Sequence, residues 1–375
     1  MTMEQIEWKS FIHGAWEKSG FEEPTAIQTK VSAPIHNGKD VIAKSPTGSG
    51  KTLAYLLPLL NKVDTEKKHV QVVILASSHE LVMQIHQEVQ KWTQGSGISS
   101  TTLIGGANMK RQIEKLKKKP NVVIGTPGRV SELINQKKLK MHEVQTLVLD
   151  EGDQLLVPEH RKTIQGIVKS TLNDRQILLF SATLSENTEQ EAKGFMRESE
   201  VIKVSEEEIN KPEVEHIYFV CEARDKIDIV RKVARHSGVK ALAFLKEISH
   251  LQAMAEKLEY KGLSVGVLNS DSNKQDRANT LKDFRAGNLP LLLSTDVAAR
   301  GLDITDLTHI IHVDLPEDIN QYIHRSGRTG RLGSTSGTVI SVVTPKEEKM
   351  LKKFSRDLEI PVSKKVFYKG EIQDA

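Results

Sequence analysis

The sequence is poor in cysteine and has no long apolar run. Cys221 is the only cysteine among 375 residues, which excludes an internal disulfide and a cysteine-based zinc cluster. It ends the apolar run 217–221, which predicts a strand, so we expect a buried and inert thiol. No stretch approaches the ~18 uninterrupted apolar residues of a membrane-spanning helix, and residues 1–10 carry Glu4 and Glu7 rather than a basic and then an apolar segment. We therefore expect a soluble, cytoplasmic protein that makes no membrane contact.

The sequence also lacks a large excess of charge of either sign. The chain has 53 lysines and arginines against 49 aspartates and glutamates, and a net charge of +4 is too small to identify a polyanionic ligand. Apolar residues make up 38%, enough to exclude wholesale disorder. At ~100 to 200 residues per domain, the length predicts two domains.

Residues 206–213 have the composition of a linker, because they are polar, charged and interrupted by Pro212. We place a first domain at 1–205, a second at 214–362 and a short tail at 363–375. Apolar runs alternate with helix-period stretches in both domains and predict strands at 41–43, 70–76, 121–125, 146–150, 176–180, 240–245, 264–268, 290–295, 309–314 and 337–343. Strands that are apolar on both faces predict two tandem α/β domains, each a mainly parallel sheet flanked by helices. Ligands of such sheets bind beyond the carboxyl ends of the strands.

A glycine-rich loop follows the first predicted strand and precedes a helix-forming run. Gly48 and Gly50 permit a tight turn whose N–H groups, at a helix N-terminus, form a cradle for phosphates. Lys51 is expected to reach the β- and γ-phosphates of a nucleotide, and the Thr52 hydroxyl to ligate Mg²⁺. An ordinary glycine turn is the alternative, and Ser45 stands where the general pattern has glycine. We assign to the nucleotide the loop residues Ser45, Pro46, Thr47, Gly48, Ser49, Gly50, Lys51 and Thr52.

Carboxylates follow the predicted strand at 146–149. Asp150 stands where a nucleotide-bound magnesium ion needs a second protein anchor. Glu151 is then expected to polarise or orient the attacking water. A solvated acidic turn is the alternative for residues 150–153.

With these two segments the chain resembles the DEAD-box family of ATP-dependent RNA helicases, part of helicase superfamily 2, over about residues 8–345. The resemblance implies two RecA-like domains, ATP and Mg²⁺ as cofactors, and RNA-dependent ATP hydrolysis. The family's box reads Asp-Glu-Ala-Asp, and Gly152 here replaces the alanine. We expect this change to leave the carboxylates in place, although glycine loosens the backbone.

Upstream of the loop, Phe21, Pro24, Thr25 and Gln28 resemble the family's Q motif. In that motif the glutamine hydrogen-bonds the adenine edge, and the aromatic residue seven positions earlier stacks on the base. Phe11 matches a further upstream aromatic. Taken alone, Gln28 favours a position on a helix surface.

Ser181 and Thr183, after the strand ending at residue 180, match the family motif that couples the ATP state to the other domain. The resemblance assigns Asp153 and His324 to the same coupling. Capping of a helix by the two hydroxyls is the alternative.

Two loops of the first domain match family segments that grip the RNA backbone. The resemblance implies RNA contacts at Gly106, Thr126 and Arg129, since loop N–H groups, a hydroxyl and a guanidinium suit sugar and phosphate oxygens. Ordinary turn chemistry is the alternative. The family's Pro-Thr-Arg-Glu-Leu-Ala appears at 77–82 as Ser-Ser-His-Glu-Leu-Val. His79 lacks the permanent charge of arginine, so we expect a weaker contact there.

Residues 324–331 read His-Arg-Ser-Gly-Arg-Thr-Gly-Arg. Three arginines at a spacing of three predict several guanidinium groups on one face, suited to phosphate oxygens. By resemblance, Arg328 and Arg331 are arginine fingers that reach the γ-phosphate bound by the first domain. A surface salt-bridge cluster is the alternative.

Residues 295–303 match a segment in which Asp303 contacts the ATP ribose while Thr295 and Arg300 face RNA. Asn269, Ser270 and Lys274 depart from the family's His-Gly-Asp and Gln-x-x-Arg patterns. Arg277 remains as an expected RNA contact.

Together the matches predict an ATP-driven clamp on single-stranded RNA that separates short duplexes locally. We expect a monomer that binds mainly the sugar-phosphate backbone, independently of sequence and with strong salt dependence. Short bacterial members of the family suggest ribosomal RNA or ribosome precursors, or RNA remodelling in the cold, as the setting. An RNA-binding platform or annealing chaperone with incidental hydrolysis is the alternative, and a DNA-dependent helicase is disfavoured by the Q motif.

Overall fold

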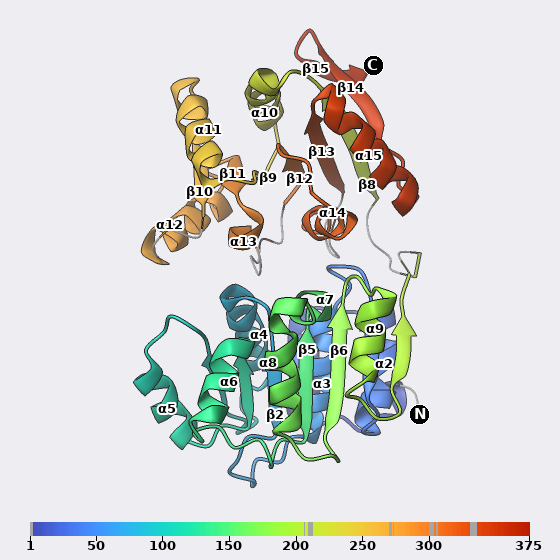
Figure 1. Cartoon of the computed structure of the whole chain (residues 1–375), viewed down its shortest axis with the longest axis vertical. Coiled ribbons are helices and arrows are strands. Elements are labelled where there is room, and N and C mark those ends of the chain that lie inside the picture. Colours follow the sequence, from blue (N-terminus) through green and yellow to red (C-terminus); the bar gives the residue numbers. More distant parts are fainter. Residues whose placement is uncertain are drawn as a thin grey trace. The chain divides into compact units, whose positions relative to one another are not determined.

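Short apolar strands form two separate sheets in this protein, as the sequence predicts. The structure is a computed structural model that describes residues 3–205, 207–208, 213–269, 272, 274–299, 304, 307–330 and 336–375. The chain divides into two compact units, Met1–Ile209 and Asn210–Ala375 (Figure 1). Each unit is a mostly parallel sheet with helices on its faces, so the predicted α/β fold class is confirmed.

The first unit contains a seven-stranded sheet in the order β3-β4-β2-β5-β6-β1-β7, and its strand pairs are parallel. The strands are β1 (Val41–Lys44), β2 (Val72–Leu75), β3 (Ser100–Leu103), β4 (Val122–Gly125), β5 (Thr146–Asp150), β6 (Gln176–Ser181) and β7 (Glu200–Lys203). The helices are η1 (Met3–Gln5), α1 (Ser10–Ser19), α2 (Ala26–His36), α3 (Lys51–Lys62), α4 (His79–Trp92), α5 (Met109–Lys117), α6 (Pro127–Asn135), α7 (Gly152–Leu155), α8 (Pro158–Lys169) and α9 (Glu186–Lys193).

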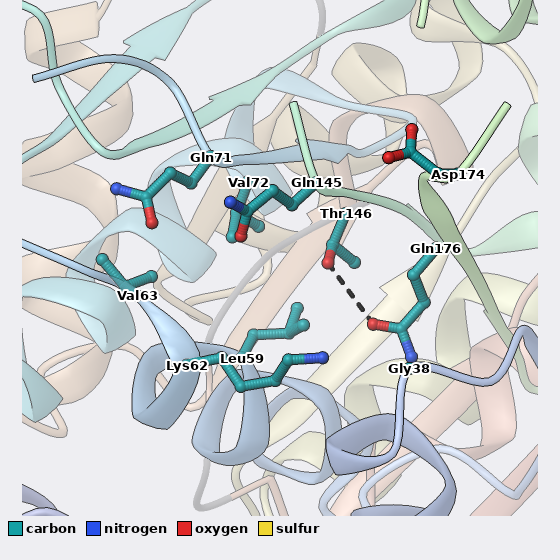
Figure 2. A pocket seen from close by; sticks show the side chains of 10 residues that line it. All are labelled: Gly38, Leu59, Lys62, Val63, Gln71, Val72, Gln145, Thr146, Asp174 and Gln176. Atoms are coloured by element: carbon teal, nitrogen blue, oxygen red, sulfur yellow. Dashed lines mark hydrogen bonds between the residues drawn. The ribbon is translucent and has the colours of Figure 1, made fainter. Parts of the chain in front are cut away.

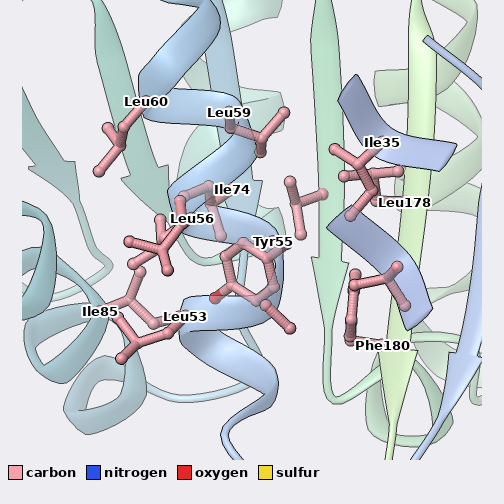
Figure 3. Close-up of a cluster of buried hydrophobic side chains, with 14 of the residues drawn as sticks. Ile35, Leu53, Tyr55, Leu56, Leu59, Leu60, Ile74, Ile85, Leu178 and Phe180 are labelled. Carbon is pink, nitrogen blue, oxygen red and sulfur yellow. The ribbon is translucent and has the colours of Figure 1, made fainter. Parts of the chain in front are cut away.

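The strand β2 shows why this sheet is buried on both faces. Its side chains alternate, so that Val72 and Ile74 join one hydrophobic cluster while Val73 and Leu75 join the other. Helix α3 packs in the first of these clusters, where Tyr55 and Leu56 lie with Phe180 of β6 (Figure 3). The sheet is thereby packed on both faces behind the loops at its carboxyl edge.

The second unit contains an eight-stranded sheet in the order β10-β11-β9-β12-β13-β8-β14-β15. Its strands are β8 (Val214–Val220), β9 (Ala241–Phe244), β10 (Val265–Leu268), β11 (Leu291–Ser294), β12 (His309–His312), β13 (Gly337–Val343), β14 (Ser363–Tyr368) and β15 (Glu371–Asp374). Its helices are η2 (Ala223–Asp225), α10 (Lys226–Ala234), α11 (Ile248–Tyr260), α12 (Lys274–Arg285), α13 (Asp296–Ala299), α14 (Ile319–Ser326) and α15 (Pro345–Leu358).

The end of the chain differs from the expected tail. Residues 363–374 form a hairpin in which β14 pairs in parallel with β8 and in antiparallel fashion with β15 (Figure 1). Phe367 of this hairpin stacks on Phe219 of β8 with ring centroids 5.0 Å apart. The hairpin is therefore an extension of the second sheet. Cys221 directly follows β8 and is half-buried rather than buried, and desolvation raises the pKa of its thiol.

Within the described parts of the chain, no helix combines the length and the apolar character needed to cross a bilayer.

Candidate functional site

The predicted phosphate loop lies between β1 and α3, at the carboxyl edge of the first sheet. Gly48 and Gly50 have φ angles of 71° and 90°, a conformation that side chains disfavour. The ammonium group of Lys51 donates hydrogen bonds to the carbonyl oxygens of Ser45 and Pro46, each at 2.7 Å. The loop therefore curls around a positive charge at the N-terminus of α3, where phosphate would bind.

Ser45, which departs from the general pattern, closes the base of this loop. Its side chain is fully buried, and its hydroxyl donates to the Ser49 hydroxyl at 2.6 Å. Its backbone N–H also bonds to the carbonyl of Ser181 at 3.1 Å. Glycine could also make the backbone bond to β6, whereas the hydroxyl contact with Ser49 is one that glycine lacks.

Gln28 lies against the loop, so its position on a helix surface, favoured by the residue alone, is wrong. The residue is 2% exposed, and its Nε2 donates to the carbonyl of Gly50 at 3.4 Å. Its Oε1 accepts from the N–H of Thr25 at 3.0 Å, which completes a capping box at the start of α2. One amide therefore fixes both the entry of α2 and the phosphate loop.

Phe21 is 45% exposed and belongs to an aromatic cluster. Its ring stacks on Trp92 at a centroid distance of 6.5 Å and meets Trp16 edge-on at 5.7 Å. Phe11 lies in α1 and is half-buried against the core. The cluster leaves part of the Phe21 ring open to a planar ligand.

Asp150 ends β5 and is 4% exposed. Its Oδ2 accepts a hydrogen bond from the Tyr55 hydroxyl at 2.8 Å, and its Oδ1 accepts from the N–H of Glu151 at 2.9 Å. Burial, followed by the charge of Glu151, raises the pKa of Asp150 to about 6, whereas Tyr55 and Lys51 act to lower it. A cation beside Asp150 would offset the cost of keeping it ionised.

The donor set at this point fits a magnesium ion. The Thr52 hydroxyl and the Asp150 carboxylate are hard oxygen donors, and Mg²⁺ in nucleotide enzymes takes few protein ligands and completes its shell with water and phosphate. In the described residues no group of three histidine, cysteine or acidic side chains could hold a metal ion by itself. Two hard oxygen donors from the protein suit a metal that arrives with a nucleotide.

Glu151 follows Asp150 in a left-handed backbone conformation, with φ 56° and ψ 54°. Such a conformation in a residue other than glycine is strained and is commonly found at functional sites. The carboxylate accepts a hydrogen bond from the hydroxyl of Ser77.

The packing around Gly152 could not be predicted from the sequence. A Cβ at this position would lie 2.6 Å from Cγ of Leu179, a distance that real Cβ contacts do not show. Leu179 therefore occupies the space that the family's alanine methyl needs. The expectation that the glycine merely removes one methyl group is incomplete, because a neighbouring side chain fills that space.

The predicted coupling residues of the first unit meet in one place. Thr183 donates its hydroxyl hydrogen to the Asp153 carboxylate, and the N–H of Asp153 bonds to the Ser181 hydroxyl at 3.3 Å. Both hydroxyls thus contact the acidic segment, and the helix α9 that follows them is capped by Ser185. The Asp-Glu segment and the end of β6 are linked directly.

Arg129, one of the predicted RNA residues of the first unit, links α6 to the loop that contains Gly106. Its guanidinium bonds to the carbonyl of Ala107 at 3.2 Å and to Glu132 at 3.0 Å, and its side chain is 9% exposed. Gly106, with φ 65°, forms the loop beside Ala107, and Thr126 is the residue before α6. The exposed His79 begins α4 with its ring beside Gly105.

In the second unit, Arg277 reaches α13. Its Nη2 donates to the carbonyl of Ala298 at 2.6 Å, and the Thr295 hydroxyl accepts from the N–H of Ala298 at 3.4 Å. The structure thus brings Arg277 and Thr295 to the same short helix. Asn269 is 6% exposed and accepts a hydrogen bond from Ser272 at 3.0 Å.

Arg325, the first arginine of residues 324–331, does not lie on an exposed face. Arg325 is 1% exposed and forms a two-pronged ion pair with Asp296, with both nitrogen–oxygen distances 2.6 Å. Arg328 follows the end of α14, and His324 lies within that helix. The predicted row of guanidinium groups is therefore wrong for Arg325, which braces α13 against α14. Outside the described residues lie Ser270, Arg300, Asp303 and Arg331, and the side chain of Lys274.

A cavity of about 160 Å³ lies at the opposite edge of the first sheet (Figure 2). It is lined by the starts of β2, β5 and β6, where the Thr146 hydroxyl donates to Gln176 at 3.3 Å, and by Lys62 of α3. Because ligands of parallel sheets bind at the carboxyl edge, this cavity is not the nucleotide site.

Sequence reasoning missed two residues of the site. Tyr55 stands in the helix-forming run after Thr52 and is indistinguishable there from a core aromatic. Ser77 stands two residues after the end of β2, and its position beyond a central strand was the available signal.

Comparisons with known proteins agree with this geometry. The model of the DEAD/DEAH box helicase family matches residues 25–191, and that of the helicase conserved C-terminal domain matches residues 225–333. The chain belongs to the DEAD-box helicase family. The probable ATP-dependent RNA helicase YfmL of Bacillus subtilis is 51% identical over 365 residues, covering 97% of this chain and 96% of the relative. The DEAD-box ATP-dependent RNA helicase CshC of Bacillus cereus is 50% identical over 364 residues, or 97% and 93% of the two chains.

Solved structures extend the likeness of this DEAD-box protein to its fold. The structure of S. cerevisiae Dbp5 bound to RNA and ADP BeF3 matches with a TM-score of 0.87 at 28% identity, covering 97% of this chain and 95% of the other. Both units of this DEAD-box protein are accordingly RecA-like.

Proposed function

We propose that this DEAD-box protein is an ATP-dependent RNA helicase that uses ATP binding and hydrolysis to clamp single-stranded RNA. The observation that carries the proposal is the convergence of Gln28, Lys51 and Asp150 on one loop. Gln28 bonds to Gly50 of the loop, Lys51 lies across it, and the Lys51 charge acts on the pKa of Asp150. Family membership supports the same reaction.

Each part of the nucleotide has a partner in this proposal. Phe21 and Gln28 hold the adenine, and the loop amides and Lys51 hold the phosphates. Thr52 and Asp150 would hold Mg²⁺, which supplies positive charge to the phosphates. Glu151 orients the water that attacks the γ-phosphate.

The second unit completes the reaction in this proposal. Arg328 and Arg331 stabilise the γ-phosphate when the two units close on ATP and RNA, and such arginine fingers contribute ~10³ to 10⁵ in rate in other systems. Asp303 contacts the ribose. Signalling between nucleotide and RNA passes through Ser181, Thr183, Asp153 and His324.

The RNA strand in this proposal is held mainly by its sugar-phosphate backbone. Its contacts come from Gly106, Thr126, Arg129, Arg277, Thr295 and Arg300. A strand held in a form that a duplex cannot adopt separates short helices without movement along them. We propose a monomer, with ribosomal RNA or its precursors as the substrate.

Steady-state ATP hydrolysis with and without RNA tests the proposal. RNA is expected to raise the rate, and Glu151→Gln to lower kcat by about a hundredfold or more while ATP still binds. Glu159→Gln, at an exposed acidic residue in the first turn of α8, is the matched control. An ATP hydrolysis rate that several different RNAs leave unchanged, or full turnover in Glu151→Gln, would contradict the proposal.

An RNA-annealing platform with incidental hydrolysis is the second candidate. The exposed imidazole of His79 beside Gly105 favours it, because histidine lacks the permanent charge and the two-pronged geometry with which arginine binds phosphate. Single-turnover separation of a short duplex, measured beside annealing of the same two strands, distinguishes the candidates. Faster annealing without ATP-dependent separation would favour the platform.

A further inference from the structure

Two consecutive serines that follow β2, Ser77 and Ser78, have different roles. The Ser78 hydroxyl accepts a hydrogen bond from the N–H of Leu81 at 3.2 Å and so caps α4. The Ser77 hydroxyl instead donates to Oε2 of Glu151, a residue 74 positions further along the chain. The contact is therefore a tertiary one.

The strand register explains why these two side chains meet. The strands β2 and β5 are adjacent and parallel, with Leu75 paired to Leu149. Ser77 and Glu151 each stand two residues beyond these partners. The segments that follow β2 and β5 therefore leave the sheet at the same level. The N–H of Ala76 is bonded to the carbonyl of Gly125 at 3.1 Å, which fixes the backbone just before Ser77.

The Glu151 carboxylate needs such a partner. Its backbone is fixed by the left-handed conformation and by the bond of its N–H to Asp150, but its side chain has three rotatable bonds. A carboxylate that orients water acts only from a narrow range of positions, and small displacements reduce the rate strongly. A hydrogen bond to one oxygen restricts this freedom and leaves the other oxygen for the water.

We propose that Ser77 is a positioning residue for ATP hydrolysis, which holds the Glu151 carboxylate in the orientation that it needs toward the attacking water. The proposal rests on the function proposed above. The family segment has proline at this position, and proline carries no hydroxyl. The contact is thus not implied by the family's motif.

The test compares Ser77→Ala with Ser77→Thr in RNA-stimulated hydrolysis. Ser77→Ala is expected to lower kcat about tenfold with KM for ATP changed less than about twofold, since loss of one hydrogen bond to a charged group has an effect of this size. Ser77→Thr keeps a hydroxyl and is expected to retain most of the activity. Ser96→Ala, whose half-buried hydroxyl bonds to the carbonyl of Thr93 at 2.7 Å, is the matched control and leaves kcat unchanged.

A double-mutant cycle with Glu151→Gln separates positioning from a general structural role. In single-turnover measurements, Ser77→Ala is expected to lower the rate less than about twofold when Glu151 is already replaced. An equal loss in both backgrounds, or an unchanged or raised kcat in Ser77→Ala alone, would overturn the positioning role. If Glu151→Gln itself turns over normally, the proposed function and the positioning role are both overturned, whereas an inactive Glu151→Gln beside a normal Ser77→Ala removes only the latter.

Discussion

The hydroxyl of Tyr55 lies 2.8 Å from Oδ2 of Asp150 and donates a hydrogen bond to it. Tyr55 is fully buried on α3, one helical turn beyond Thr52, and its ring packs on Phe180 (Figure 3). Burial and the charge of Asp150 raise the pKa of this phenol well above its usual value, so it remains a donor throughout the physiological range. A residue of the hydrophobic core thus sets the direction of a proposed metal ligand.

Tyr55→Phe should raise the Mg²⁺ concentration needed for half-maximal ATP hydrolysis, by about three- to tenfold. The hydrogen bond from Tyr55 lowers the pKa of Asp150, so its loss lets the carboxyl keep a proton to higher pH. We therefore expect a larger effect at pH 6.5 than at pH 8, measured by magnesium titrations at both values. If Tyr55→Phe and the wild type need the same Mg²⁺ concentration at pH 6.5, Tyr55 does not orient Asp150 for the metal.

Gly152→Ala restores the family's Asp-Glu-Ala-Asp sequence but should lower the free energy of unfolding by about 1 to 3 kcal/mol, because the methyl group meets Leu179. Leu179→Ala should relieve the clash, so the double variant is expected to lose at least about 1 kcal/mol less than the sum of the single losses. Urea unfolding of the four proteins measures this coupling.

Gly166→Ala serves as the control for that cycle. Gly166 lies within α8, and a Cβ there would meet nothing within 4 Å. Alanine should therefore stabilise the helix by about 0.5 to 1 kcal/mol. Additive losses in the Gly152 and Leu179 cycle would show that Leu179 does not occupy the methyl position.

Gln28→Glu should separate the two roles of this amide. The carboxylate still accepts from the N–H of Thr25 and keeps the capping box, but it cannot donate to the carbonyl of Gly50. We expect ATP binding to weaken about tenfold or more with a small change in melting temperature. Gln28→Ala should lose both hydrogen bonds, and its free energy of unfolding should fall by about 1 kcal/mol. Equal ATP affinity of Gln28→Glu and the wild type in fluorescence titrations would refute the assignment.

His216 should make the second unit sensitive to acid. Desolvation lowers its pKa to about 4, below the ~6.5 of an unfolded chain, and its Nδ1 lies 2.8 Å from the Tyr322 hydroxyl. The unfolded state thus binds the proton first as the pH falls, so the contribution to stability is complete above pH 6.5 and is lost toward pH 4.

His216→Gln should reduce the loss of stability between pH 7 and pH 5 by about 1 to 2 kcal/mol. The remaining loss includes His312, which is buried beside Tyr322 and has a pKa well below its usual value. Denaturant unfolding at both pH values measures the difference, with His250→Gln, at an exposed residue of α11, as the control. Parallel losses in His216→Gln and the wild type would exclude this origin.

The central strands and the phosphate loop could be predicted from sequence, because each depends on local patterns. The sequence of β2 is Val-Val-Ile-Leu, an apolar run that predicts a buried strand. Closely spaced glycines such as Gly48 and Gly50 predict a turn. The strands β3 and β7 were missed because both lie at sheet edges and contain polar residues, as in the Ser-Thr-Thr-Leu sequence of β3.

Residues whose partners are distant in the chain were predicted less well. Helical spacing placed Arg325 with Arg328, but spacing does not reveal Asp296, which pairs with Arg325 across 29 residues. Gln28 was recognised only through the family motif, because its contact with Gly50 arises from tertiary packing. The hydroxyls of Tyr55 and Ser77 likewise have partners that are distant in the chain and could not be predicted from local patterns.

The hairpin of β14 and β15 limits how far this protein can be shortened. Cleavage after residue 362 would remove the Phe367 ring that stacks on Phe219. It would also remove the strand that pairs with one edge of β8. An uncovered strand of this kind pairs readily with other chains. We therefore expect a chain that lacks residues 363–374 to aggregate more readily, although these residues are remote in sequence from every proposed nucleotide contact.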